Sequence, residues 1–161
     1  MSTDRALQWY FANGATASKI TLGIPMYGRA FENTAGIGAP FSGVSTPVTC
    51  SYPSGADRAR LQIGPGTIEA GIYSYKFLPL AGATVYDNLT DIASYSYDAA
   101  KRELVSYDTP RVATLKAQYA QNKNLAGAMF WEVSSSARLP VASIDADEAI
   151  RMVALDRQAG H

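Results

Sequence analysis

Two short stretches of the chain carry an apolar pattern that is typical of β-strands. In residues 19–27 apolar and polar positions alternate, and residues 125–131 form an apolar run that ends in Met-Phe-Trp. The alternating apolar residues of the first stretch are Ile20, Leu22, Ile24 and Met26. Alternation with a period of two, or a short apolar run between turn residues, indicates a strand. We therefore predict a buried strand in each stretch.

A helix is predicted over residues 2–13. Ser2 or Thr3 can cap its start, because a hydroxyl there accepts a hydrogen bond from the first turn. Asp4 suits the first turn, and Gly14 can end the helix. The residues expected to share its buried face are Leu7, Tyr10 and Phe11.

A second helix is predicted to begin after Asp108. Asp108 or Thr109 can cap it, and Pro110 fits its first turn because the fixed φ of proline suits that position. Its expected buried stripe consists of Val112, Leu115 and Tyr119. A helix between two apolar strands implies parallel strands joined by a right-handed crossover.

The segment between the first strand and the second helix has two parts. Residues 32–68 are rich in Gly, Pro, Ser and Thr and are predicted to form loops. Residues 69–107 contain short β-prone runs, which indicates a small β-rich unit. The runs are residues 71–77, 83–86, 93–97 and 103–107, with a hairpin turn expected at residues 98–101.

The composition excludes several classes of function. The 161 residues include 14 basic and 14 acidic side chains, so the formal net charge is +0 and no basic stripe favours nucleic acid. No apolar run is long enough to predict a membrane-spanning helix. The single cysteine, Cys50, and the single histidine, His161, exclude an internal disulfide, a multi-histidine metal site and Ser-His-Asp catalysis. We expect neither a metal nor a cofactor.

Polar and aromatic residues follow the two predicted strands. Tyr27 and Arg29 come just after the first, and both can donate hydrogen bonds to the hydroxyl rim of a sugar. Trp131 ends the second, and its flat ring can stack against the apolar face of a sugar. The alternative for all three is structural: a tyrosine ending a strand, a solvated arginine and a tryptophan packed at a strand end.

No acid–base pair of the kind used in glycoside hydrolysis is evident. The carboxylates considered for such a pair are Glu32, Glu69, Asp87, Asp91, Asp98, Glu103 and Glu132. The densest acidic cluster, residues 145–148, is more typical of a solvated helix start. Glu132 follows Trp131 and is expected on the opposite face of the strand. We therefore predict no catalytic residue in this chain.

The sequences of the two predicted strands and of the β-rich unit resemble those of a known family. Residues 19–31, Lys-Ile-Thr-Leu-Gly-Ile-Pro-Met-Tyr-Gly-Arg-Ala-Phe, resemble the seventh barrel strand of glycoside hydrolase family 18 chitinases. Residues 125–131 resemble the eighth strand, and residues 69–75 and 97–107 resemble the α+β insertion between strand seven and its helix. The similarity covers residues 2–136 and is closest to fungal secreted endochitinases.

The resemblance implies a fold and a set of site residues. The fold class is α/β, a partial TIM (β/α)8 barrel with an α+β insertion subdomain. Trp131 would form the floor of the subsite for the reacting N-acetylglucosamine, and Tyr27 and Arg29 would line the same cleft. Glu69 would be the acidic residue of the insertion that faces the groove.

The organisation implied is a C-terminal fragment of such an enzyme. The family's catalytic signature, Asp-x-x-Asp-x-Asp-x-Glu, and its Met-x-Tyr-Asp element are absent. The expected parts are a barrel segment (1–31), the insertion subdomain (32–107), a second barrel segment (108–136) and an atypical tail (137–161). Residues 45–63 and the tail have no family counterpart, and we hypothesise that both are translated intron sequence.

The parent protein implied is a secreted chitinase that cleaves β-1,4 linkages between N-acetylglucosamine units with retention, assisted by the substrate's acetamido group. Its partners would be chitin or chito-oligosaccharides and the missing N-terminal barrel segment of the same protein. Within that protein the chain would supply substrate-binding residues but not the catalytic acid. The isolated chain is expected to be poorly soluble and not to hydrolyse chito-oligosaccharides. Two alternatives stay open: a non-catalytic chitin-binding lectin on the same fold, and an independent α/β domain of unrelated function.

Overall fold

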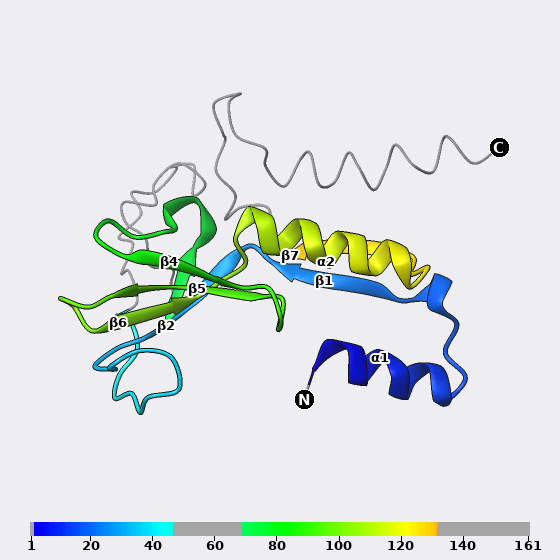
Figure 1. Cartoon of the computed structure of the whole chain (residues 1–161), viewed down its shortest axis with the longest axis horizontal. Coiled ribbons are helices and arrows are strands. Elements are labelled where there is room, and N and C mark those ends of the chain that lie inside the picture. The colour runs from blue at the N-terminus through cyan, green and yellow to red at the C-terminus, as the bar shows by residue number, and fades with distance from the viewer. Residues whose placement is uncertain (1, 47–68, 132–161) are drawn as a thin grey trace, which may run out of the picture.

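The computed structural model describes residues 2–46 and 69–131 (Figure 1). Within them the chain forms a parallel pair of strands with two α-helices beside it, and a separate antiparallel sheet of five strands. The strands of the antiparallel sheet lie in the sequence between the two strands of the parallel pair. Figure 1 shows the parallel pair and its helices at one end and the antiparallel sheet at the other. The hypothesised foreign segments lie almost wholly outside the described residues, as do Cys50, Glu132 and His161.

The parallel pair consists of β1 (Thr21–Pro25) and β7 (Gly127–Trp131), in register from Thr21 opposite Gly127 to Pro25 opposite Trp131. The predicted parallel arrangement is therefore confirmed. Helix α2 (Pro110–Asn122) packs on both strands. One core cluster of Leu7, Ala120 and Leu125 joins this helix to α1 (Thr3–Ala12).

Helix α1 follows the sequence prediction at both ends. Ser2 Oγ accepts a hydrogen bond of 3.3 Å from the backbone N–H of Arg5, and Gly14 has a φ of 87°, a value that ends helices and suits glycine. The predicted face is wrong in one respect. Tyr10 is 51% exposed and packs edge-to-face on Trp9, whereas Leu7 belongs to the core cluster and Phe11 packs against it.

Helix α2 also begins as predicted, with Pro110 first and Thr109 Oγ1 accepting a hydrogen bond from the backbone N–H of Val112. Val112 is fully buried, whereas Leu115 and Tyr119 are only half-buried. Small residues make up much of the buried face, since the helix lies close against the strands. The buried alanines are Ala113, Ala117 and Ala120.

The antiparallel sheet has the strand order β3-β2-β6-β5-β4. Its strands are β2 (Tyr27–Phe31), β3 (Ile72–Ser74), β4 (Thr84–Asn88), β5 (Ala93–Asp98) and β6 (Glu103–Ser106). Each of the four predicted β-prone runs therefore overlaps one strand, and β4 and β5 extend past their runs to Asn88 and Asp98. The first run is shorter than predicted, because residues after Ser74 turn into the 3-10 helix η3 (Tyr75–Phe77). A second short 3-10 helix, η1 (Ala17–Lys19), precedes β1.

The first predicted strand is divided between the two sheets. The apolar alternation runs without a break through Met26, but the backbone changes partners there. Met26 donates its N–H to the carbonyl of Trp131 (2.6 Å), and its own carbonyl accepts from the N–H of Tyr75 (3.3 Å). Met26 thus links the end of the parallel pair to the start of the antiparallel sheet, and Tyr27 and Arg29 belong to the second sheet.

No helix within residues 2–46 and 69–131 is both long and apolar enough to cross a bilayer.

Candidate functional site

The carboxyl ends of β1 and β7 present one large aromatic side chain to solvent. Trp131 is 63% exposed and lies opposite Pro25, the last residue of β1. Met129, two residues earlier on β7, shares the face of Trp131 by strand alternation and is 44% exposed. Sequence reasoning did not single out Met129. Its spacing of two predicts that it shares the face of Trp131, but an apolar residue within an apolar run carries no signal of exposure.

Tyr27 and Arg29 follow directly on β2 and point to the same face of the antiparallel sheet. Arg29 is exposed and Tyr27 is half-buried, and the guanidinium carbon lies 5.7 Å from the centre of the Tyr27 ring. This distance is within the range of a cation–π contact, so each side chain limits the freedom of the other. The chain therefore places a paired phenol and guanidinium one residue beyond the backbone contact between Met26 and Trp131.

Close packing on the opposite face of β2 explains why the residue between Tyr27 and Arg29 is a glycine. A Cβ at this position would come within 2.7 Å of both the Leu78 and the Val105 side chains. The other face of β2 is thus packed against the sheet's hydrophobic core too closely for any side chain. That core consists of Ala30, Tyr73, Val105 and Tyr107, with Tyr75, Leu78 and Leu80 packed against it.

Glu69 lies at the start of the segment that leads into β3. Its backbone carbonyl accepts a hydrogen bond of 3.3 Å from the N–H of Ile72, and Ile72 is the strand partner of Arg29. The residue as a whole is exposed. The antiparallel sheet thereby brings Glu69 to the neighbourhood of Arg29, although Glu69 lies far from Arg29 in the sequence.

Two tyrosines behind β2, the partly buried Tyr75 and the buried Tyr107, remain protonated at neutral pH. Burial raises the pKa of Tyr75 to about 12, helped by the nearby Tyr107 phenol and the Asp108 carboxylate. Burial also raises the pKa of Tyr107. Their rings meet edge-to-face with centres 6.2 Å apart. Both phenols are packing elements that support the strand carrying Tyr27, because neither can act as a base at physiological pH.

Several carboxylates have structural partners. Asp108 forms an ion pair of 2.6 Å with Lys116, and Asp98 one of 3.2 Å with Lys101. Asp87 accepts a hydrogen bond from Thr109, and Asp91 accepts one from Asn88. These contacts hold turns and a helix cap in place. We therefore assign the four carboxylates structural roles and not the roles of a catalytic acid and base.

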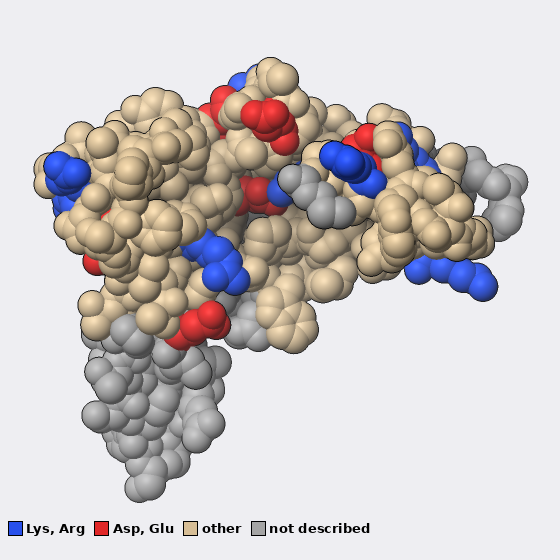
Figure 2. All heavy atoms as spheres, turned by 90° about the horizontal axis from the view of Figure 1, so that it is seen from below, with Lys and Arg blue, Asp and Glu red and all other residues tan. Residues whose placement is uncertain are grey.

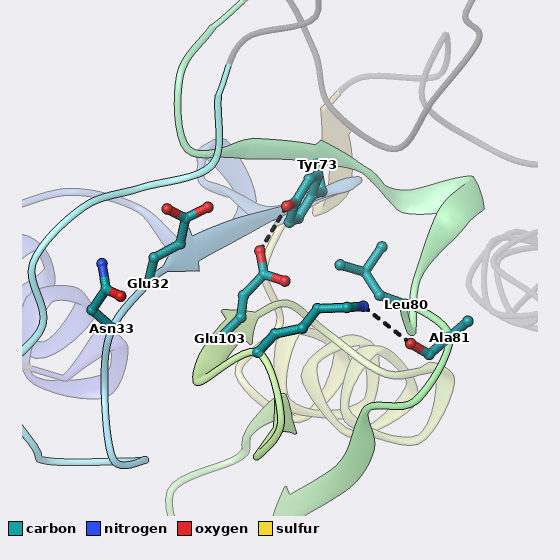
Figure 3. Close-up of a pocket in the computed structure, with 7 residues that line it drawn as sticks. Glu32, Asn33, Tyr73, Leu80, Ala81 and Glu103 are labelled. Carbon is teal, nitrogen blue, oxygen red and sulfur yellow. Dashed lines mark hydrogen bonds between the residues drawn. The ribbon is translucent and has the colours of Figure 1, made fainter.

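Glu103 belongs to a separate cavity of about 500 Å³ on the core side of the antiparallel sheet (Figure 3). Glu103 is 7% exposed and accepts a hydrogen bond of 2.6 Å from the Tyr73 hydroxyl. The cavity is lined by Glu32, Asn33, Tyr73, Leu80, Ala81, Lys101 and Glu103. None of the four residues predicted to bind sugar lies in this cavity, so it is distinct from the candidate site.

The described residues show no arrangement for a metal ion, since no group of three or more His, Cys, Asp or Glu side chains converges within them. On the face shown in Figure 2, basic and acidic side chains occur in small groups of both signs among mostly uncharged residues. Such a face offers no continuous basic patch for a polyanion. Hydrogen bonding and stacking are therefore the chemistry that the candidate site can provide.

Comparison with known proteins identifies relatives of this arrangement. Residues 1–135 match the family model described as glycosyl hydrolases family 18. The chain is 44% identical over 140 residues to endochitinase 1 of Metarhizium robertsii, an alignment that covers 86% of this chain and 28% of that protein. It therefore spans little more than a quarter of the length of this relative.

Two solved structures are similar to the fold. A Cycas revoluta family 18 chitinase in complex with (GlcNAc)3 aligns with a TM-score of 0.65 and 25% identity, covering 98% of this chain and 40% of that one. Human YKL-39, described as a pseudo-chitinase with retained chitooligosaccharide binding properties, aligns with a TM-score of 0.65 and 26% identity, covering 83% and 33%.

Proposed function

Because the chain belongs to glycosyl hydrolase family 18, we propose that it supplies part of the sugar-binding surface of a chitinase and lacks the catalytic acid. On this account β1 and β7 are the last two strands of a (β/α)8 barrel, and the antiparallel sheet is an insertion forming one wall of the groove. Active sites of such barrels lie at the carboxyl ends of the strands, where Trp131 and Tyr27 are found.

One observation carries the proposal. The hydrogen bond from Met26 N–H to Trp131 C=O brings the exposed indole next to the start of β2, which presents Tyr27 and Arg29. An exposed indole provides a stacking surface, and a phenol and a guanidinium provide hydrogen-bond donors. The apolar face of the N-acetylglucosamine ring can stack on the indole. The hydroxyl groups at the rim of the ring can accept hydrogen bonds from the phenol and the guanidinium.

The proposed roles follow from these positions. Trp131 is the floor of the subsite for the reacting sugar, and Tyr27 and Arg29 bind its hydroxyl or acetamido oxygens. Glu69 accepts hydrogen bonds from sugar hydroxyls on the insertion side. No metal or cofactor is needed for these contacts.

The parent enzyme is proposed to act outside the cell and to hydrolyse β-1,4 linkages with retention. In that reaction the substrate's acetamido oxygen attacks the anomeric carbon while a carboxylic acid protonates the leaving oxygen. The acid belongs to a barrel strand outside this sequence, so the chain binds sugar without cleaving it. A second candidate function, non-catalytic chitin binding, is favoured by one specific finding, the similarity to human YKL-39.

The two tryptophans of the chain provide a matched test of the proposal. Trp131 and Trp9 are 63% and 61% exposed, but Trp9 lies on α1, away from the candidate site. We expect Trp131→Ala to weaken binding of N-acetylchitotetraose by more than tenfold, since a central aromatic contact contributes roughly 2 kcal/mol or more. Trp9→Ala should leave the affinity unchanged. Affinity electrophoresis in gels containing the soluble sugar measures both, and equal effects of the two substitutions would contradict the proposal.

A further inference from the structure

The register of the antiparallel sheet aligns residues from four strands in one transverse row. Arg29 on β2 lies opposite Ser106 on β6, Ser106 lies opposite Tyr95 on β5, and Tyr95 lies opposite Tyr86 on β4. Directly opposite residues of paired strands project to the same face. This row, Arg29–Ser106–Tyr95–Tyr86, therefore continues across the sheet from the face that bears Tyr27.

The two tyrosines of the row form a stacked pair at its end. The rings of Tyr86 and Tyr95 have centres 5.0 Å apart and planes inclined by only 16°. Tyr86 covers one ring face of Tyr95 from the β4 side. The other ring face of Tyr95 is therefore turned toward β6, where the residue opposite is the small Ser106.

The row has room for a flat ring between Tyr95 and Arg29. Strands in a sheet are about 5 Å apart, so these two residues, two strands apart, are separated by about 10 Å. A ring in contact with a surface on each side needs about 7–8 Å, because carbon atoms in contact are 3.5–4.0 Å apart. Ser106 between them is exposed and can donate or accept a hydrogen bond.

This half of the sheet face is open within the described residues, whereas the other half is covered. Segment 32–46 packs over the covered half, with the Phe41 ring against Phe31 (4.9 Å between centres) and the Thr34 carbonyl accepting from the Tyr97 hydroxyl (3.0 Å). In contrast, Tyr86 is 44% exposed. The row presents an aromatic face, hydroxyl groups and one guanidinium, with no carboxylate.

These features point to one kind of ligand, and we propose that the row binds a further N-acetylglucosamine unit of the chito-oligosaccharide held by Tyr27 and Trp131. This inference rests on the proposed function, because Arg29 belongs to both surfaces and makes them continuous. The sugar stacks on Tyr95, and its hydroxyl or acetamido oxygens accept hydrogen bonds from Arg29 and Ser106. Tyr86 supports the Tyr95 ring from behind.

The test compares a long and a short ligand in affinity electrophoresis of the full chain, with N-acetylchitohexaose and N,N′-diacetylchitobiose as the two sugars. We expect Tyr95→Ala to weaken hexamer binding roughly two- to tenfold, the effect of losing one aromatic stacking contact. Binding of the dimer should change less than twofold. Tyr95→Phe should keep the full affinity, since stacking requires only the ring. Tyr10→Ala, which removes a tyrosine of 51% exposure on α1, is the matched control.

The outcomes separate this inference from the proposed function. If Trp131→Ala abolishes binding while Tyr95→Ala leaves hexamer binding unchanged, the inference is overturned and the proposed function is supported. Equal weakening of hexamer and dimer binding by Tyr95→Ala also overturns it, because that pattern reports a general loss of structure. If the unsubstituted chain binds neither sugar, both the proposed function and the inference are contradicted.

Discussion

Individual residues of the candidate site were predictable where a polar or aromatic side chain directly follows an apolar strand. Tyr27, Arg29 and Trp131 stand out because polar and aromatic side chains follow apolar strands. The reason for the glycine between Tyr27 and Arg29 was not predictable, since it depends on Leu78 and Val105, which approach β2 only in the folded sheet. Met129 was overlooked because an apolar residue within an apolar run carries no signal of exposure.

Gly28 provides a prediction at this scale. Gly28→Ala should lower the free energy of unfolding by about 1–3 kcal/mol, because the new methyl group overpacks the core at Leu78 and Val105. Gly23→Ala is the matched control. Its Cβ would lie 3.8 Å from the nearest atom, the terminal methyl of Met129, which is an ordinary contact. Urea denaturation measures both, and equal stability of the two variants would refute the packing argument.

Tyr73 provides a second prediction. Its hydroxyl is the hydrogen-bond donor to the buried Glu103 carboxylate, at 2.6 Å. Tyr73→Phe should reduce the free energy of unfolding by about 1–3 kcal/mol, because the carboxylate loses that donor without becoming solvated. Tyr86→Phe, at an exposed tyrosine on β4, is the control. A Tyr73→Phe variant as stable as the control in urea would count against this role.

At the scale of elements, local signals predicted the helices and turns better than the division of the chain into sheets. Ser2, Thr109 and Pro110 act within one helical turn of their own positions, so the sequence contains the whole signal. The break at Met26 depends on hydrogen bonds to Trp131 and Tyr75, which are distant in the sequence. The apolar alternation continues through Met26, and one long strand was therefore predicted where two strands exist.

The β5–β6 hairpin gives a pH-dependent prediction. Asp98 Oδ1 accepts hydrogen bonds from the N–H groups of Ala100 (2.9 Å) and Lys101 (3.0 Å), and these bonds, with the Lys101 ammonium, lower its pKa. A carboxylate whose pKa is lower in the folded state stabilises the fold above its unfolded pKa, about 3.9. That stabilisation is lost as the pH falls through the folded pKa.

The unsubstituted chain should therefore melt at a higher temperature than Asp98→Asn at pH 6. The difference in melting temperature should shrink progressively below about pH 4, as the carboxylate becomes protonated. Thermal denaturation followed by circular dichroism across this range checks the prediction. A difference that stays constant from pH 6 to pH 2 would show that the charge of Asp98 has no part in the stability of the turn.

At the scale of the whole molecule, family membership is established and the partial barrel is our proposal. The parallel pair of strands was predictable from the helix between two apolar strands, and the small β-rich unit was predictable from the β-prone runs. The sequence could not reveal that the antiparallel sheet places a row of residues, from Arg29 to Tyr86, on the side that carries Tyr27. Strand order and register depend on long-range pairing, which no local pattern encodes.

The proposed barrel has a consequence for the isolated chain. Within the described residues β1 and β7 pair only with each other, and Met129 and Trp131 are exposed. Unpaired strand edges and exposed apolar side chains favour association between copies. We expect the purified chain to self-associate as its concentration rises, measured by sedimentation velocity. A chain that stays monomeric at high concentration would argue that the parallel pair needs no further strands.

The central claim is that this chain binds chito-oligosaccharide through Trp131 and its neighbours but contains no acid to cleave it. The most direct measurement is to incubate the purified chain with N-acetylchitohexaose and to quantify both bound sugar and shorter products by chromatography. We predict binding that Trp131→Ala weakens by more than about tenfold, with no shorter oligosaccharide formed. Release of shorter oligosaccharides by the chain, lost in the Trp131→Ala variant, would contradict the account.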